Sequence, residues 1–158
     1  MIYVIYTSSG SEQAVMYELL DKGYKAYVPR ELYSYRKGGR WHDTIRLLFD
    51  GYVFVDIAVL TPEIYYDIKS VYCVGGFVSK TTGLSDTESE YIIGLCKNRD
   101  IVQPSTGHIV DGHLRIDSGY LQQYENKIVK YSRRQHKAVI EITLYGEPHR
   151  ITCTVNIK

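Results

Sequence analysis

The sequence predicts a mixed α+β protein: an N-terminal α/β sandwich with a mainly antiparallel sheet, and a small C-terminal antiparallel β-barrel. Residues 1–100 alternate strand-like and helix-like patterns, whereas the residues after 110 show strand patterns alone. Residues 101–110 combine proline, glycine, serine and threonine. We therefore expect a first domain at 1–100, a linker at 101–110 and a second domain at 111–158.

The first domain is expected to begin with a strand and a helix. Ile2 to Tyr6 is a β-rich run. Ser9 and Glu12 have the spacing of a capping box, which predicts a helix start, and Gly23 predicts where that helix ends. Tyr24 to Val28 then predicts a short second strand.

A basic hairpin and an apolar strand follow. Residues 35–41, Tyr-Arg-Lys-Gly-Gly-Arg-Trp, are typical of a hairpin tip, with a returning arm from Thr44 to Phe49. Tyr52 to Val55 predicts a strand, and Gly75-Gly76 predicts a turn before a short strand.

Two further helix starts and three C-terminal strands complete the prediction. Thr61 before Pro62 places an N-cap residue ahead of a proline, and Ser85 with Glu88 forms a second capping box. The C-terminal strands are expected at residues 127–132, 137–145 and 150–157.

Composition restricts the function. The 19 Lys and Arg residues against 18 Asp and Glu give a net charge of +1, which excludes a protein that coats nucleic acid through bulk charge. The charge divides unevenly, with 11 basic and 13 acidic residues in 1–100 but 8 and 5 in 101–158. The 16 tyrosines suit surfaces that are partly buried or that meet a partner.

The sequence gives no sign of a membrane span or of structural disulfides. Its apolar runs fall far short of the roughly 18 residues that a span needs, and the amino terminus lacks a signal-peptide pattern. Cys73, Cys96 and Cys153 are odd in number and widely separated. We expect free thiols in a reducing cytosol, and therefore a cytoplasmic protein.

Motifs for catalysis are also missing from the sequence. The five histidines follow no zinc-protease spacing, and nucleophile-elbow, Walker and dinucleotide patterns do not occur. His108 and His113 lie beside Asp111 but have no third soft ligand nearby. We therefore expect no enzyme, no cofactor and no metal site.

Two constellations leave alternatives open. Along one strand, Tyr52 and Phe54 point to the face opposite Val53, so these aromatics form either buried core or an exposed patch for a partner. Residues 127–137 hold five cations and no acid, which fits either a solvated loop or a nucleic-acid site where Tyr131 could stack on unpaired bases.

Several segments carry a family resemblance. They are Tyr3 to Thr7, Ser9 to Glu12, Ala26 to Arg30 and Leu48 to Val55. These segments resemble the amino-terminal domain of the NusG family of transcription elongation factors. Residues 132–139, with Leu144-Tyr145-Gly146, are similar to the KOW domain of LoaP, a specialised paralogue that acts as an antiterminator on long biosynthetic operons.

The resemblance implies a monomeric processivity or antitermination factor. Its first domain would bind the clamp helices of the largest subunit of RNA polymerase through Tyr6, Phe49, Tyr52 and Phe54. Its second domain would bind a structured leader RNA through Lys127, Lys130, Arg133, Arg134 and Lys137. The hairpin residues Arg36, Lys37 and Arg40 would reach either upstream DNA or the opposite lobe of the polymerase. The alternative is an adaptor whose KOW domain binds ribosomal protein S10 or Rho.

Overall fold

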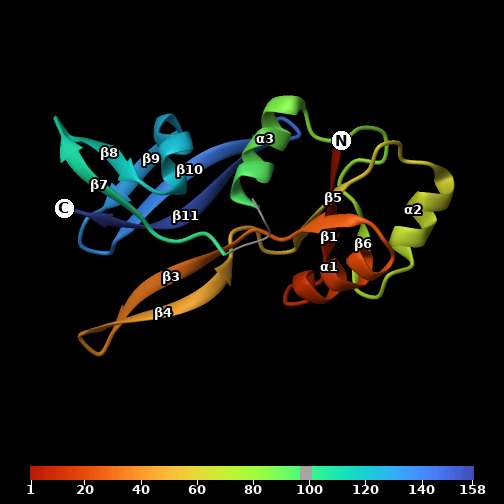
Figure 1. The fold of residues 1–158 in the computed structure, drawn as a ribbon, viewed down its shortest axis with the longest axis horizontal. Coiled ribbons are helices and arrows are strands. Elements are labelled where there is room, and N and C mark those ends of the chain that lie inside the picture. The colour runs from red at the N-terminus through yellow and green to blue at the C-terminus, as the bar shows by residue number, and fades with distance from the viewer. Residues whose placement is uncertain (97–100) are drawn as a thin grey trace. The chain divides into compact units, whose positions relative to one another are not determined.

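The computed structural model describes residues 1–96 and 101–158, which divide into two compact units. Unit 1 comprises Met1–Val28 and Phe49–Ile92, and unit 2 comprises Pro29–Leu48 and Ile93–Lys158. The predicted mixed α+β fold is confirmed, with an antiparallel sheet in unit 1 and a curled sheet in unit 2 (Figure 1).

Unit 1 is built on four antiparallel strands in the order β2-β5-β1-β6. Their bounds are β1 Ile2–Thr7, β2 Lys25–Tyr27, β5 Tyr52–Asp56 and β6 Val74–Phe77. The register pairs Tyr6 with Tyr52 and Val4 with Phe54, which puts these four side chains on one face of the sheet. Phe77 pairs with Ile5 on the opposite face.

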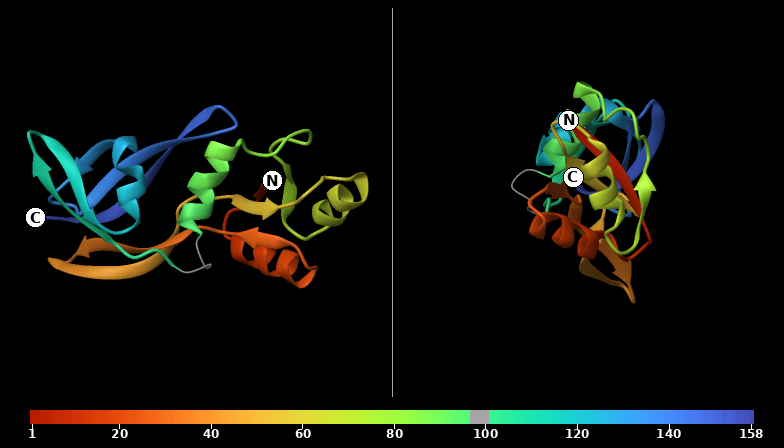
Figure 2. Two further views of the ribbon diagram at one scale, coloured as in Figure 1. Left: turned by 45° about the horizontal axis from the view of Figure 1, so that its top comes forward. Right: turned by 90° about the vertical axis from the view of Figure 1, so that its right-hand side faces the viewer.

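Helices α1 (Glu12–Asp21), α2 (Pro62–Lys69) and α3 (Asp86–Leu95) complete this part of the chain, and Figure 2 shows α1 running alongside the sheet. The ring of Tyr65 in α2 stacks on Phe77 at 5.3 Å between centroids, so α2 covers the face opposite Tyr6. Tyr6 therefore lies on the face of the sheet that α2 does not cover.

Two predicted helix starts are confirmed. The Thr61 hydroxyl accepts a hydrogen bond from Ile64 N at 3.3 Å. At α3, Glu88 N donates to Ser85 Oγ at 3.2 Å, and Ser85 N donates to Glu88 Oε1 at 3.1 Å, which is a reciprocal capping box.

The predicted capping box at α1 is wrong. The N-cap residue is Ser11, and its side chain makes no capping hydrogen bond. The Glu12 carboxylate is buried, and it accepts from Gly10 N at 2.9 Å and from Gly51 N at 3.2 Å. Glu12 therefore ties the start of α1 to the loop before β5, a contact that the local spacing of Ser9 and Glu12 does not predict.

Unit 2 contains a five-stranded sheet in the order β8-β7-β11-β10-β9. Only the β7–β11 pair is parallel among the described strands of this sheet. The sheet curls so far that Tyr131 Oη donates to Gly112 O at 2.9 Å, which joins its two edges. The bounds are β7 Ser105–Val110, β8 His113–Ser118, β9 Ile128–Ser132, β10 Lys137–Leu144 and β11 Glu147–Ile157.

The predicted basic hairpin is confirmed as β3 (Arg30–Lys37) and β4 (Arg40–Leu47), but it belongs to unit 2. Gly38 and Gly39 form its turn with φ values of 61° and 74°, a conformation that glycine adopts without strain. The hairpin lies beside β7 and β11 in Figures 1 and 2. Ser34 N donates to Thr154 Oγ1 of β11 at 3.2 Å.

The structure differs from the predicted linker and domain boundary. Residues 105–110 form β7, and Val102 pairs with β3, where Leu32 N donates to Val102 O at 3.0 Å. A 3₁₀-helix at Tyr120–Lys127 also follows, where strands alone were expected. Proline and glycine weaken the local strand signal here, but pairing with strands distant in sequence restores the structure.

The described residues also bear on the expectations about membrane spans, cysteines and metal sites. None of its helices combines the length and apolar character needed to cross a membrane. Cys96 and Cys153 are buried free thiols, and burial raises the pKa of each to about 12. The residues that the structure describes contain no group of three or more His, Cys, Asp or Glu side chains suited to a metal ion.

Candidate nucleic-acid interface and aromatic surface

A buried carboxylate fixes the β3–β4 hairpin against the C-terminal sheet. Glu31 is fully buried, and its Oε2 accepts from Tyr120 Oη at 2.9 Å and from Thr154 N at 3.3 Å. Arg46 Nη2 lies 3.7 Å from Oε1 and also donates to Thr152 O at 2.6 Å. Burial raises the pKa of Glu31, while the hydrogen bonds and the nearby Arg46 oppose that rise.

Lys137 joins the same contact from β10. Its ammonium lies 3.3 Å from the centroid of the Tyr33 ring and donates to Ser34 O. The guanidinium of Arg46 lies 3.7 Å from the same ring centroid. Lys137, a predicted nucleic-acid contact, is thus also tied to β3 by a cation–π contact and a hydrogen bond.

A second contact lies nearer the hairpin tip. The rings of Trp41 and His136 stack with centroids 3.9 Å apart and planes 6° from parallel. His136 lies in the turn between β9 and β10 with a φ of 56°. Burial lowers the pKa of His136, and the positive charges of Lys137 and Arg36 lower it further. The neutral imidazole is therefore the form that stacks at neutral pH.

Between these contacts lies a groove of about 750 Å³. Its lining includes three cations and no acidic side chain. Three aromatic residues accompany them, so charge and flat rings share one surface. The lining residues are Tyr33, Tyr35, Arg36, Gly39, Trp41, Ser132, Arg134, Gln135 and Lys137.

The structure brings together part of the predicted nucleic-acid set. Arg36 and Arg134, almost one hundred positions apart in the sequence, line the same groove. Lys37 and Arg40 are exposed at the adjoining hairpin tip, and Arg133 is exposed in the β9–β10 turn. These three residues do not themselves line the groove, and neither do two others: Lys130 lines a different pocket, and Lys127 ends the 3₁₀-helix.

Sequence reasoning missed the aromatic part of this surface. Tyr35 and Trp41 flank the basic tip in the sequence, so the interleaving of rings and cations was visible there. Tyr33 and Glu31 gave no such signal, because their roles depend on contacts with β10, β11 and the 3₁₀-helix.

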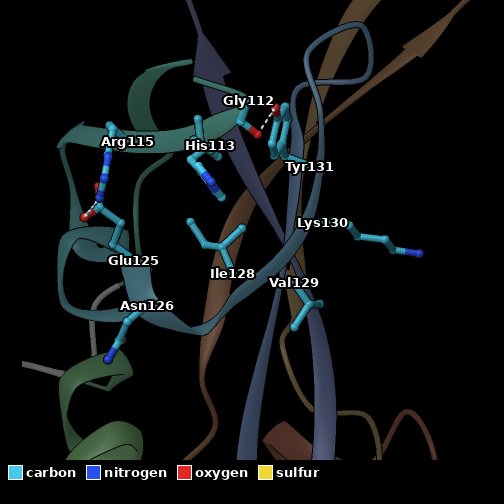
Figure 3. Close-up of a pocket in the computed structure, with 10 residues that line it drawn as sticks. Gly112, His113, Arg115, Glu125, Asn126, Ile128, Val129, Lys130 and Tyr131 are labelled. Carbon is cyan, nitrogen blue, oxygen red and sulfur yellow. Dashed lines mark hydrogen bonds and ion pairs between the residues drawn. The ribbon is translucent and has the colours of Figure 1, made fainter. Parts of the chain in front are cut away.

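A second pocket lies between the two edge strands of the curled sheet and measures about 560 Å³ (Figure 3). His113 and Ile128 point into it, whereas Lys130 points away. Arg115 Nη1 lies 3.7 Å from Glu125 Oε2 at its rim. This pocket thus has mixed charge, unlike the basic groove.

In unit 1, the predicted aromatic patch is only partly exposed. Tyr6 is 46% exposed and Tyr52 is half-buried. The expectation of an exposed patch is wrong for Phe49 and Phe54, which are buried and pack edge-to-face at 5.3 Å between centroids. Both residues therefore belong to the core, which was the alternative interpretation.

The Tyr6 ring lies over a glycine pair. Gly75 and Gly76 lie within β6, not in the predicted turn. A Cβ atom added to Gly75 would stand 2.4 Å from Tyr6 Cε2, and one added to Gly76 would stand 2.9 Å from Tyr6 Oη. The absence of side chains at these two positions is what allows the ring to lie on the strand.

Comparisons with known proteins agree on one family. Residues 2–93 match the family model described as "Transcription termination factor nusG". The "Transcription termination/antitermination protein NusG" of Bacillus subtilis is 29% identical over 151 residues, covering 81% of this chain and 85% of that protein. The protein of the same name from Halalkalibacterium halodurans is 24% identical over 159 residues, covering 91% and 89%.

A solved structure shows the same fold. The structure described as "Domain interaction in Thermotoga maritima NusG" has a TM-score of 0.60 at 22% identity, covering 98% of this chain and 93% of that one. The fold and the family match define a transcription termination/antitermination factor. The chain belongs to the NusG family, because the family model spans more than half of its length.

Proposed function

We propose that this NusG-family protein is a processivity or antitermination factor with two working surfaces. Unit 1 binds RNA polymerase through the aromatic face that carries Tyr6, and unit 2 binds a leader RNA through its basic groove. The observation that carries the proposal is the groove itself, where Arg36 and Arg134 converge from distant segments and no acidic side chain lines the surface. Clustered cations gain affinity for phosphates by releasing counterions.

The family resemblance and the exposure of the Tyr6 side chain support the polymerase-binding surface. Tyr6 and Tyr52 are registered partners, so their rings lie on one face. Phe49 and Phe54 support that face from within the core. Tyrosine is frequent in protein interfaces because it has an apolar body and a polar tip. The partner is the pair of clamp helices of the largest polymerase subunit.

The mechanism is a shift between polymerase states. A factor that bridges the clamp and the opposite lobe binds the closed clamp better than the open one, so it disfavours the opening that pausing and termination require. RNA bound to unit 2 tethers the factor near the polymerase and raises its effective concentration there. No covalent chemistry is needed.

Gel shifts on the native leader RNA test the nucleic-acid surface. The double variant Arg133→Ala, Arg134→Ala is expected to bind more weakly and with a shallower dependence on salt than the wild type. Lys25→Ala, which removes an exposed cation from unit 1, is the matched control and should change neither. Equal affinity and equal salt slope in the double variant would reject this surface.

Co-purification with core polymerase tests unit 1. Tyr6→Ala is expected to reduce the amount of polymerase retained, since truncating a central interface aromatic typically costs more than about 1 kcal/mol. Tyr17→Ala removes a tyrosine of α1 that is 55% exposed, and it serves as the control. Undiminished binding of the folded Tyr6 variant would contradict the assignment.

A second candidate is an adaptor whose C-terminal unit binds a protein such as ribosomal protein S10 or Rho. The pocket between the edge strands favours it, because Val129 beside that pocket is 45% exposed (Figure 3). Edge strands offer unpaired backbone groups to a partner. Transcription across an intrinsic terminator separates the candidates, because a Rho adaptor lowers read-through only when Rho is present.

A further inference from the structure

The basic groove of unit 2 has a shape and chemistry more specific than a phosphate-binding surface. Trp41 is 39% exposed and Tyr35 is 36% exposed, and both line the groove. Exposed aromatic rings contribute nothing to counterion release, so charge alone does not account for them. Flat rings of this kind are suited to stacking with nucleobases.

Each ring is already held in place. Trp41 stacks on His136, and Tyr35 stacks on His42 with centroids 5.5 Å apart and planes 25° from parallel. Tyr33 lies 6.4 Å from Tyr35 at an interplanar angle of 22°. Rings that are ordered before binding lose little side-chain entropy when a ligand arrives.

The cations stand beside these rings. Arg36 pairs with Trp41 across the hairpin, and Arg134 lines the same groove from the β9–β10 turn. Ser132 and Gln135 add a hydroxyl and an amide to the lining, groups that hydrogen-bond to the 2′-hydroxyl of ribose. The groove thus has partners for base, phosphate and sugar within about 750 Å³.

We propose that this groove is a single-stranded RNA site, with unpaired bases stacked on Trp41 and Tyr35 and phosphates bound by Arg36 and Arg134. The proposal rests on the proposed function and adds that the RNA is read where it is unpaired. A duplex buries the faces of its bases, so it can reach the cations but not the rings. The hairpin and the C-terminal sheet both contribute, which is why Glu31 and Lys137 are positioning residues for the site.

The single tryptophan makes a direct test possible. Trp41 is the only tryptophan in the chain, so intrinsic tryptophan fluorescence reports on this groove alone. The full-length protein is titrated with a labelled 12-nucleotide single-stranded RNA of mixed sequence, and both label anisotropy and tryptophan emission are recorded. We expect binding to quench the emission, while a duplex RNA of the same sequence and inorganic polyphosphate leave it unchanged.

Variants separate stacking from charge. Trp41→Ala should weaken RNA binding about 5- to 150-fold, the range expected for one lost base–aromatic stack, at an unchanged salt slope. Arg134→Ala should reduce the salt slope by about 0.7. Trp41→Phe retains a ring and should recover most of the affinity, which guards against a folding defect in the alanine variant.

The outcomes distinguish this site from the proposed function. RNA that binds without quenching and tolerates Trp41→Ala would overturn the stacking site while leaving RNA binding intact. If the protein bound neither the mixed RNA nor the native leader RNA, both the stacking site and the proposed RNA-binding function would be overturned. Equal or tighter binding of single-stranded DNA of the same sequence would overturn the assignment to RNA.

Discussion

The indole ring of Trp41 stacks on the imidazole ring of His136, with centroids 3.9 Å apart and planes 6° from parallel. Trp41 belongs to the β3–β4 hairpin and His136 to the turn between β9 and β10, so this pair joins two segments that are far apart in the sequence. Trp41 also lines the basic groove. The state of His136 should therefore affect the groove.

Acidification is expected to weaken this contact. The pKa of His136 is lowered by burial and by Lys137 and Arg36, so the folded protein binds the proton less tightly than the unfolded chain does. The contribution of His136 to the free energy of unfolding should be constant above the ordinary value of 6.5 and fall as the pH drops from there through the lowered pKa. Denaturant unfolding of unit 2, followed by Trp41 fluorescence between pH 8 and pH 5, measures this. His136→Gln should remove this contribution, and an unaltered pH profile in that variant would contradict it.

Glu31 should give the opposite pH dependence. Burial raises its pKa, so the folded protein binds this proton more tightly than the unfolded chain, and stability falls as the pH rises from the ordinary value of 4.5 through the raised pKa. Glu31→Gln lacks this titration. The free energy of unfolding of the wild type should therefore decline relative to that of Glu31→Gln as the pH rises; parallel curves would count against a raised pKa.

Loss of the Tyr120 hydroxyl is expected to destabilise unit 2. Tyr120 Oη donates to Glu31 Oε2 at 2.9 Å, and Tyr120→Phe leaves the buried carboxylate with one donor fewer. Hydrogen bonds to charged groups contribute about 1.5–3 kcal/mol, which is the loss expected in chemical denaturation. Tyr72→Phe, at a side chain that is 84% exposed, should change stability by less than about 0.5 kcal/mol. A Tyr120→Phe variant as stable as that control would show that the buried bond is unimportant.

A substitution at Gly75 should disturb the aromatic surface without removing a ring. The added Cβ of Gly75→Ala would stand 2.4 Å from Tyr6 Cε2 and force the ring off β6. Polymerase co-purification should therefore drop in Gly75→Ala. In a Tyr6→Ala background the same change should add nothing, because the ring that it displaces is gone. Additive losses in the double variant would place the effect elsewhere.

The sequence correctly predicts those structural features that are determined by residues close together in the chain. The N-cap of α2 at Thr61, the capping box of Ser85 and Glu88, and the glycine turn of the hairpin all depend on side chains within four positions. The mixed α+β class follows from the same local periodicities. Local signals failed at Glu12, whose carboxylate accepts from Gly51 across the unit as well as from Gly10.

The composition of the site was partly predictable, but its assembly was not. The cations at Arg36 and Arg134 stand out in the sequence, yet nothing local indicates that they share a groove. That arrangement depends on Glu31, whose burial is stabilised by donors from the 3₁₀-helix and β11. Phe54 is buried, which the sequence could not show, because strand periodicity indicates the face on which a residue lies but not what covers that face.

The most direct measurement is single-round transcription across an intrinsic terminator placed after the protein's native leader. We expect the wild-type protein to raise read-through without Rho, and the double variant Arg36→Ala, Arg134→Ala to lose this effect when the leader is present. Lys25→Ala should act like the wild type. Unchanged read-through with the wild-type protein, or a decrease that appears only when Rho is added, would contradict the proposed antitermination function.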